Sequence, residues 1–413
     1  MKKVTLAFFV IFCSILSYKL ADQYIFGWHY VYAPPIPFQG DSIVNPYQGI
    51  NGNNVQVANF HAHTKNGILN GKGSPIDVYA KYDSIGVDIH PVSQYHNIDT
   101  SGLSNTGYIP VYEHGYNIGK THQLIIGANR VINKDFVFFQ TLHNKQEILE
   151  RLSYDSSNVV VLTHPSLNQG YTLSDLKYLH FYDHLEILSP YANSTSYWDT
   201  VLSAGKKIFV VANDDTHDVF NNNELGRFVN LIYSPNNHSK NVIKSLKNGS
   251  HAVVWLPQKT GESLIQKRKK IENIKQVFQK MDIRDSSLCL SFSKTVDTLV
   301  LFGDAGKLLQ VKQSVSSARF TLPSNLTYVR VEARFKDGTK LLFNPVYKSN
   351  AAINVSRNEL ATAFVLRDDN YNSTNRIASI SLITLVGLIG FTLKKRKKIL
   401  SWTVINEKKL LKS

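Results

Sequence analysis

The stretch VQVANFHAHT at residues 55–64 decides the fold of this 413-residue chain. Its first residues alternate in the manner of a β-strand. His61 and His63 follow two positions apart, and side chains with this spacing share one face of a strand. We therefore expect both imidazoles to point the same way at the end of this strand.

Five further residues that can hold a metal ion lie at or just past the ends of other apolar runs. They are Glu113, His122, His164, Asp215 and His217. His164 follows VVVLT at 159–163, and the next residue is a proline, which closes a strand because it cannot donate to the ladder. Asp215 and His217 follow IFVVA at 208–212, a run typical of a buried strand.

The distribution of histidine supports a metal site. A single His-x-His is weak evidence, since an isolated one is more often a surface or core feature. However, all 14 histidines lie between His29 and His251. Imidazole and carboxylate ligands without thiolates suit zinc, manganese or iron. In α/β barrels the active site lies at the carboxyl ends of the strands, so the sequence predicts a polynuclear metal centre at the mouth of such a barrel.

The order of these motifs resembles the PHP superfamily, named for polymerase and histidinol phosphatase. The matching stretches, across roughly residues 55 to 255, are NFHAHT at 59–64, GVDIHPVSQYH at 86–96, Glu113 with KTHQL at 120–124, THP at 163–165 and NDDTH at 213–217. The resemblance implies an α/β fold, a distorted PHP-type β/α barrel, and hydrolysis of phosphate esters.

The chain departs from the family pattern at three places. Asn59 stands where the family has aspartate, Tyr95 stands where it has histidine, and the stretch 65–71 lacks a further histidine. His96 comes one residue late, and a one-residue slip along a strand reverses the face. These positions normally help to build a third metal site, so we expect that site, around His217, to be weak or empty.

By resemblance, two metal sites are complete. The first would use His61, His63, Glu113 and Asp215. The second would use Glu113, His122 and His164, so that Glu113 bridges two divalent ions.

The formal charge of +15 does not indicate a nucleic-acid partner. Residues 394–413, residues 259–280 and the Lys2-Lys3 pair carry net charges of +7, +5 and +2, which leaves the metal-binding region nearly neutral. A nucleic-acid binder would be expected to carry a basic stripe on its folded surface.

Two apolar segments predict a membrane protein. Residues 1–22 begin with Met-Lys-Lys and an apolar run, as in a signal peptide or N-terminal anchor. Residues 377–393 form an uncharged run that is followed at once by KKRKK, which should stay in the cytoplasm. The main domains would then lie on the non-cytoplasmic (periplasmic or extracellular) side.

The predicted domain order follows from these patterns. It is a leader at 1–22, a PHP-like barrel domain at 23–258, a basic amphipathic linker helix at 259–281, a small all-β sandwich at 282–349, a linker at 350–376, a transmembrane helix at 377–393 and a basic cytoplasmic tail at 394–413. The sandwich is inferred from short alternating runs separated by turn signals.

The leading hypothesis is an outward-facing, membrane-anchored phosphoesterase acting on a phosphorylated small molecule or envelope component. Two divalent ions would clamp the phosphate and activate a water. Glu113 would bridge the ions, and His217 or His96 would protonate the leaving oxygen. The nearby cations Lys65, Lys120 and Arg227 are weaker candidates for holding the phosphate.

Two alternatives stay open at this point. The barrel could be catalytically decayed and serve as an envelope binding or scaffold protein, a reading supported by Asn59, Gln94 and Tyr95. The same centre could instead hydrolyse a non-phosphate ester or an amide. Metal content together with phosphatase turnover separates the three hypotheses.

Overall fold

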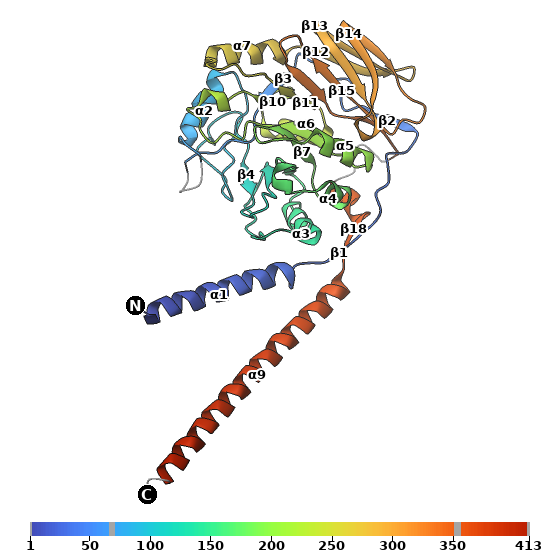
Figure 1. The fold of residues 1–413 in the computed structure, drawn as a ribbon. Helices are drawn as coiled ribbons and strands as arrows, with labels where there is room; N and C mark the ends of the chain where they lie inside the picture. Colours follow the sequence, from blue (N-terminus) through green and yellow to red (C-terminus); the bar gives the residue numbers. More distant parts are fainter. Residues whose placement is uncertain (1, 66–70, 351–356, 411–413) are drawn as a thin grey trace. The chain divides into compact units, whose positions relative to one another are not determined.

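The computed structural model describes residues 2–65, 71–350 and 357–410 (Figure 1). The chain divides into two compact units. The main unit is Tyr32–Leu366, and the terminal unit combines Met1–Val31 with Arg367–Ser413.

One of the two large sheets of the main unit has six strands. Its strands are β4 (Val111–His114), β5 (Gln123–Ile126), β6 (Val159–Leu162), β7 (His184–Ser189), β8 (Ala192–Asn193) and β9 (Phe209–Ala212). β6, β7 and β9 run parallel, whereas β4, β5 and β8 pair antiparallel. Apart from the short edge strand β8, the residues of these strands are buried on both faces, which is why the sequence shows short continuous apolar runs here.

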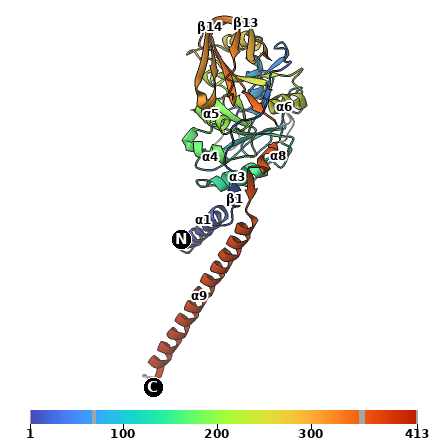
Figure 2. The same cartoon turned by 90° about the vertical axis from the view of Figure 1, so that its right-hand side faces the viewer.

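A ten-stranded antiparallel sheet forms the second layer. The main path is β12-β13-β15-β16-β11-β10-β3, and β14, β17 and β2 pair off it. The bounds are β2 (Ser42–Val44), β3 (Val55–Ala58), β10 (Phe228–Tyr233), β11 (His251–Trp255), β12 (Phe278–Arg284), β13 (Ser287–Phe302), β14 (Leu308–Thr321), β15 (Tyr328–Arg334), β16 (Lys340–Phe343) and β17 (Val346–Ser349). Figure 2 shows β13 and β14 side by side as a long hairpin.

The expected distorted β/α barrel is not confirmed, since the described residues form no closed barrel. β10 pairs antiparallel with β3 on one side and β11 on the other, and β11 pairs antiparallel with β16, with Ala252 opposite Phe343. The strands therefore belong to two open sheets in a mixed α/β fold. The predicted β-sandwich region shares its sheet and one hydrophobic core with strands of the predicted barrel region.

Asn230 on β10 joins the two sheets. Its side-chain nitrogen donates to the carbonyl of Ala58 on β3 at 3.1 Å and to that of Ala212 on β9 at 2.8 Å. Its side-chain oxygen accepts from the Ala212 amide at 3.0 Å. A buried amide with both groups satisfied fixes how β9 lies against β3.

Helices cover the sheets, and four of them begin at a side chain that caps the first turn. The capping residues are Ser74, Thr141, Thr172 and Ser263, each in a reciprocal capping box. The helices of the main unit are α2 (Pro75–Ser84), α3 (Leu142–Leu152), α4 (Leu173–Tyr178), α5 (Thr195–Ser203), α6 (Ser239–Asn248), α7 (Leu264–Lys275) and α8 (Arg357–Thr362). Short 3-10 turns lie at Leu167–Gln169, Asn222–Glu224 and Asp304–Gly306.

The helix expected at 259–281 is shorter than predicted. α7 ends at Lys275, and β12 begins at Phe278. Ile271 and Ile274 are buried in the core, so this segment packs on the main unit through its apolar face.

The terminal unit contains α1 (Lys2–Tyr24) and α9 (Asp369–Leu410). The strands β1 (Tyr30–Tyr32) and β18 (Val365–Arg367) pair where the chain passes between the units. Within the described residues, one helical stretch is long and apolar enough to cross a membrane, Asp369–Thr392. α9 begins at Asp369, within the stretch 350–376 that was predicted to be a linker. Residues 351–356 of that stretch lie outside the described ranges.

Candidate metal centre

The structure brings the seven predicted metal-binding residues into one cluster, in which all but His217 are buried. His61 and His63 follow β3, Glu113 lies on β4, His122 precedes β5, and the others follow β6 and β9. Their ligand atoms form three groups, with all atoms of a group within 4.8 Å of one another. The groups are His61, His63 and Glu113; Glu113, His122 and His164; and His63, Asp215 and His217.

Backbone contacts align the two pairs that are spaced two residues apart. The His63 amide donates to the Thr216 carbonyl at 2.8 Å, which places the loop after β3 beside the loop after β9. Asp214 is used structurally, since its carboxylate accepts from the amides of Gly226, Arg227 and Phe228. Asp215 is thereby the aspartate of this loop that is directed into the cluster.

Two cluster residues have a left-handed backbone. The φ angles are 31° at His164 and 45° at Asp215. Non-glycine residues in this region cost roughly 1–3 kcal/mol and gather at functional sites. The surrounding fold therefore stabilises His164 and Asp215 in a backbone conformation that non-glycine residues rarely adopt.

Glu113 lies at the centre of the cluster and is fully buried. Its Oε2 is 3.2 Å from His63 Nε2 and 3.4 Å from His61 Nε2. Its Oε1 is 2.9 Å from His122 Nδ1 and 3.6 Å from His164 Nε2. Burial raises the pKa of the Glu113 carboxyl, but the imidazoles of His61 and His122 outweigh burial and hold it well below its usual range.

The unpaired atoms of the cluster fit a cation. Glu113 Oε2 and Asp215 Oδ1 are buried and accept no hydrogen bond from the described residues. The Asp215 Oδ1 atom lies 3.2 Å from both His61 Nε2 and His63 Nε2, and those two nitrogens are 3.2 Å apart. Buried carboxylate oxygens are costly when unpaired. Oxygen and imidazole nitrogen atoms facing one space are a donor set suited to zinc, manganese or iron.

Glu186 on β7 supports the cluster and was not predicted from the sequence. Its Oε1 lies 3.0 Å from His61 Nδ1 and accepts from the Asn213 side chain at 2.8 Å. Its Oε2 accepts from the His164 amide at 3.0 Å. The available signal was a lone glutamate inside the buried strand HLEILS, since an unpaired carboxylate is rarely buried.

Tyr95 fills the position where the resemblance implies a histidine. Its ring stacks on His63 at 4.9 Å and meets the edge of His122 at 5.5 Å. Burial, with the nearby Glu113 and Asp215 carboxylates, raises the pKa of Tyr95, which keeps its hydroxyl protonated. The third group, around His217, therefore has a phenol beside it in place of another imidazole.

His96 lies outside the three groups. Its φ is 47°, its ring stacks on Tyr116 at 4.2 Å, and its Nε2 accepts from the Gly115 amide at 2.9 Å. Burial and the neighbouring His114 lower the pKa of His96 to about 3. A nitrogen already occupied by an amide is poorly placed to protonate a leaving group.

His217 is the most exposed member of the cluster, with 36% of its side chain accessible. Its Nδ1 lies 2.9 Å from the Asp215 carbonyl oxygen, so Nδ1 carries the hydrogen. Its Nε2 is left for another partner. The half-exposed Tyr191 lies next to it, with its hydroxyl 3.4 Å from His217 Nδ1.

The three predicted phosphate-binding cations differ in their relation to the cluster. Lys65 and Lys120 are exposed, whereas Arg227 is half-buried over the Phe228 ring. Lys120 adds to the burial that lowers the pKa of His122, and Arg227 acts electrostatically on Tyr191.

Comparison with known proteins gives little support of its own. Neither a family model nor a curated protein matches the chain. Among solved structures, it is similar to a two-domain protein from Bacteroides vulgatus ATCC 8482 described as containing a predicted PHP-like metal-dependent phosphoesterase. The identity is 10% and the TM-score 0.35, over 76% of this chain and 99% of that one. A similarity this low fixes neither fold nor activity, and the metal centre rests on its own residues.

Proposed function

We propose that this chain is a metal-dependent phosphoesterase that would hold two divalent ions, with Glu113 in both ligand sets. The observation that carries the proposal is the division of the Glu113 carboxylate. One oxygen faces His61 and His63, and the other faces His122 and His164. A carboxylate shared in this way is the usual bridge of a two-metal hydrolytic site.

The residues present would hold two ions of zinc, manganese or iron. The first set is His61, His63, Glu113 and Asp215, and the second is Glu113, His122 and His164. When bound, such ions neutralise a phosphate and lower the pKa of a water. The group of His63, Asp215 and His217 is a weaker third set in this proposal, because Tyr95 replaces an imidazole beside it.

His217 is the proposed proton donor to the leaving oxygen. Its Nδ1 is fixed by the Asp215 carbonyl, and its ring is the most accessible in the cluster. Its Nε2 would donate to the leaving oxygen when the ring is protonated, and burial with the neighbouring His63 lowers the pKa of His217. His96 is not assigned this role, since its Nε2 already accepts an amide hydrogen.

The exposed side chains beside the cluster would position the substrate. Tyr191 and Tyr116 are exposed by 51% and 59%, and they flank His217 and Tyr95 respectively. Lys120 and Arg227 would add positive charge for the phosphate. Lys65 remains a weaker candidate.

The Asn59 substitution does not argue for a decayed site. Asn59 Nδ2 donates to the Phe228 carbonyl at 3.0 Å, and its Oδ1 accepts from the His61 amide at 3.2 Å. Both bonds hold the loop that presents His61. We infer a structural role for this position, so its change from aspartate leaves the ligand set intact.

We further propose that the main unit faces away from the cytoplasm. The support is the candidate span Asp369–Thr392 and the basic cluster that begins at Lys394. Protease added outside spheroplasts should then digest residues 32–366 and spare the basic tail. A main unit that survives until the membrane is breached contradicts this topology.

The function is tested on the purified full-length chain after metal removal and reloading with manganese, zinc or iron. Metal per chain is measured by mass spectrometry. Turnover is measured separately on phosphate esters, carboxylic esters and amides. Nearly two ions with phosphatase turnover support the proposal. Metal with only carboxylic-ester or amide turnover favours the alternative hydrolase, and a chain that binds no metal favours a scaffold.

A further inference from the structure

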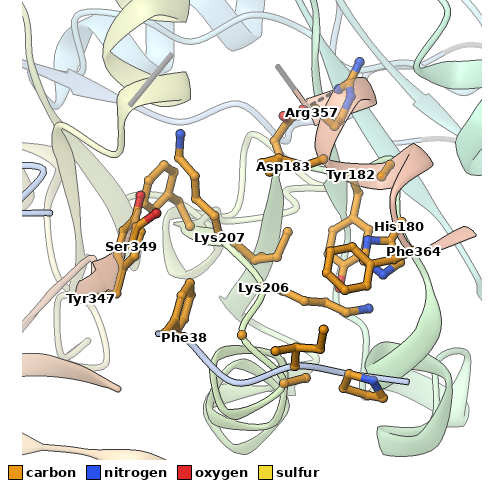
Figure 3. Close-up of a pocket in the computed structure, with 18 of the residues that line it drawn as sticks. Phe38, His180, Tyr182, Asp183, Lys206, Lys207, Tyr347, Ser349, Arg357 and Phe364 are labelled. Atoms are coloured by element: carbon orange, nitrogen blue, oxygen red, sulfur yellow. Dashed lines mark hydrogen bonds and ion pairs between the residues drawn. The ribbon is translucent and has the colours of Figure 1, made fainter. Parts of the chain in front are cut away.

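A cavity of about 730 Å³ lies apart from the metal centre, and none of the seven cluster residues lines it (Figure 3). Charged groups in its lining are already engaged. Arg357 pairs with Asp183, Lys247 donates to the Ser156 carbonyl, and Lys206 donates to two backbone carbonyls. The lining therefore does not identify a ligand for this cavity.

Beside the metal centre, by contrast, Tyr116 is an exposed aromatic side chain that is nevertheless fixed in place. It is 59% accessible. Its ring stacks on His96, with centroids 4.2 Å apart and ring planes inclined by 13°. Its amide donates to the Asp135 carboxylate at 2.6 Å, and its hydroxyl donates to the Tyr95 carbonyl at 3.4 Å. A free surface tyrosine keeps its rotamer freedom, whereas these contacts restrict Tyr116 before any ligand binds.

His96 supports the Tyr116 ring from below. Its backbone is left-handed, a conformation that non-glycine residues rarely adopt. Its Nε2 accepts from the Gly115 amide at 2.9 Å, and its ring packs on His114 at 4.5 Å. His114 is held in turn by the Gln123 side chain at 2.7 Å. His96 thus belongs to a row of fixed rings that ends at Tyr116.

The loop that carries Tyr116 touches the candidate metal ligands. Gly115 has a φ of 126°, and a Cβ at this position would lie 2.7 Å from the His122 ring. The Tyr116 ring lies 6.0 Å from that of Tyr95, which stacks on His63 at 4.9 Å. His63 and His122 belong to different ligand sets. Tyr116 is therefore linked through a single residue to each of the two proposed metal sites.

We propose that Tyr116 is a stacking platform for an aromatic group of the substrate, and that His96 positions this platform. The substrate class is then a phosphate ester that carries an aromatic ring. His96 covers one face of Tyr116, and the accessible ring can stack a second partner on its other face. A platform that is fixed before binding loses little further freedom, which favours affinity. This substrate class rests on the proposed phosphoesterase function.

The test measures the binding of three phosphonates to the full-length protein loaded with manganese, by titration calorimetry. Phosphonates are not esters, so binding is measured without turnover. Benzylphosphonate carries a planar ring, cyclohexylmethylphosphonate a puckered ring of similar size, and methylphosphonate no ring. We expect benzylphosphonate to bind about 2- to 10-fold more tightly than cyclohexylmethylphosphonate, the range for one aromatic pair.

Matched variants test the two residues. Tyr116→Leu should abolish the preference for benzylphosphonate and leave the affinity for methylphosphonate unchanged, because leucine is apolar but has no ring. His96→Gln should reduce the preference alone, because glutamine can accept from the Gly115 amide but cannot support the ring. A merely structural role of His96 would lower the affinity for all three phosphonates. Tyr154→Leu, at an exposed tyrosine between α3 and β6, is the control and should change nothing. Thermal melting verifies that each variant is folded.

The outcomes separate this inference from the function on which it rests. Equal binding of benzylphosphonate and cyclohexylmethylphosphonate overturns the aromatic substrate while the metal-dependent function stands. A preference that survives in Tyr116→Leu excludes Tyr116 as the platform, and its loss in Tyr191→Leu would assign the ring to Tyr191, beside His217. If none of the three phosphonates binds, the proposed phosphoesterase function fails as well.

Discussion

Glu186 Oε1 lies 3.0 Å from His61 Nδ1, and both side chains are fully buried. A carboxylate can only accept, so Nδ1 carries the hydrogen and Nε2 presents its lone pair to the centre of the cluster. Metal-binding histidines are oriented in this way by a second residue. The same glutamate also fixes the His164 amide, so one carboxylate positions parts of both proposed metal sites.

Glu186→Gln should weaken metal binding about 10- to 100-fold, because it removes the charge that orients His61 while keeping the side chain's size. Chelator competition on the purified protein measures the affinity. Glu147→Gln, at another buried glutamate paired with Arg151 in α3, is the control and should leave the affinity unchanged. An unchanged metal affinity in Glu186→Gln would show that Glu186 packs against the cluster without orienting its ligands.

Glu113→Gln should lose most metal from both sites, since each Glu113 oxygen faces a different histidine pair. His164→Ala should mainly empty the second site, because His164 belongs to only one group. Elemental analysis of metal per chain distinguishes the two results. Full metal content in Glu113→Gln would show that Glu113 is not a metal ligand.

His217→Gln should lower turnover about 10²- to 10⁴-fold, the usual contribution of a general acid, while metal content stays near that of the unmodified protein. His96→Gln should have a far smaller effect, because His96 Nε2 is held by the Gly115 amide. Steady-state kinetics of both variants, with the metal content of each measured in parallel, distinguishes the two roles. Loss of metal in His217→Gln would instead make His217 a ligand.

Asp199→Ala should destabilise the main unit by about 3–5 kcal/mol, because it leaves a buried arginine without its partner. Arg330 on β15 donates to both Asp199 oxygens, at 2.7 and 2.8 Å, and thereby ties the predicted sandwich region to α5. Chemical unfolding should show one shifted transition. Asp285→Asn, in the exposed pair with Arg319, is the control and should change stability little, because asparagine also accepts the left-handed backbone at this position.

Stability should fall as the pH is lowered from about 6.5 toward 4. Burial lowers the pKa of His251 to about 4, whereas the unfolded chain titrates near 6.5. The unfolded state binds the extra proton in this window, so the contribution of His251, about 3 kcal/mol, is complete above pH 6.5 and is lost as the pH approaches 4. His251→Gln should flatten the dependence of the melting temperature on pH, and an unchanged slope would contradict this assignment.

Local patterns in the sequence were sufficient to find the cluster residues. The spacing of His61 and His63, and the polar residues at the ends of the apolar runs, depend only on strand periodicity and strand ends. The structure gathers these seven residues, with ligand atoms of each group within 4.8 Å. Their roles as metal ligands remain a prediction for the experiments above.

The tertiary structure decided what depends on pairing between distant segments. The barrel prediction is not confirmed, because β11 pairs with β16, far along the chain. Which strand pairs with which cannot be deduced from the residues of either strand alone. His96 leaves the cluster through a left-handed backbone at φ 47°. Glu186 looked like one polar residue in an apolar strand until the fold placed His61 against it. Chemistry encoded over a few residues was thus readable from the sequence, whereas sheet order and the supporting carboxylate arise only when segments far apart in the chain pack together.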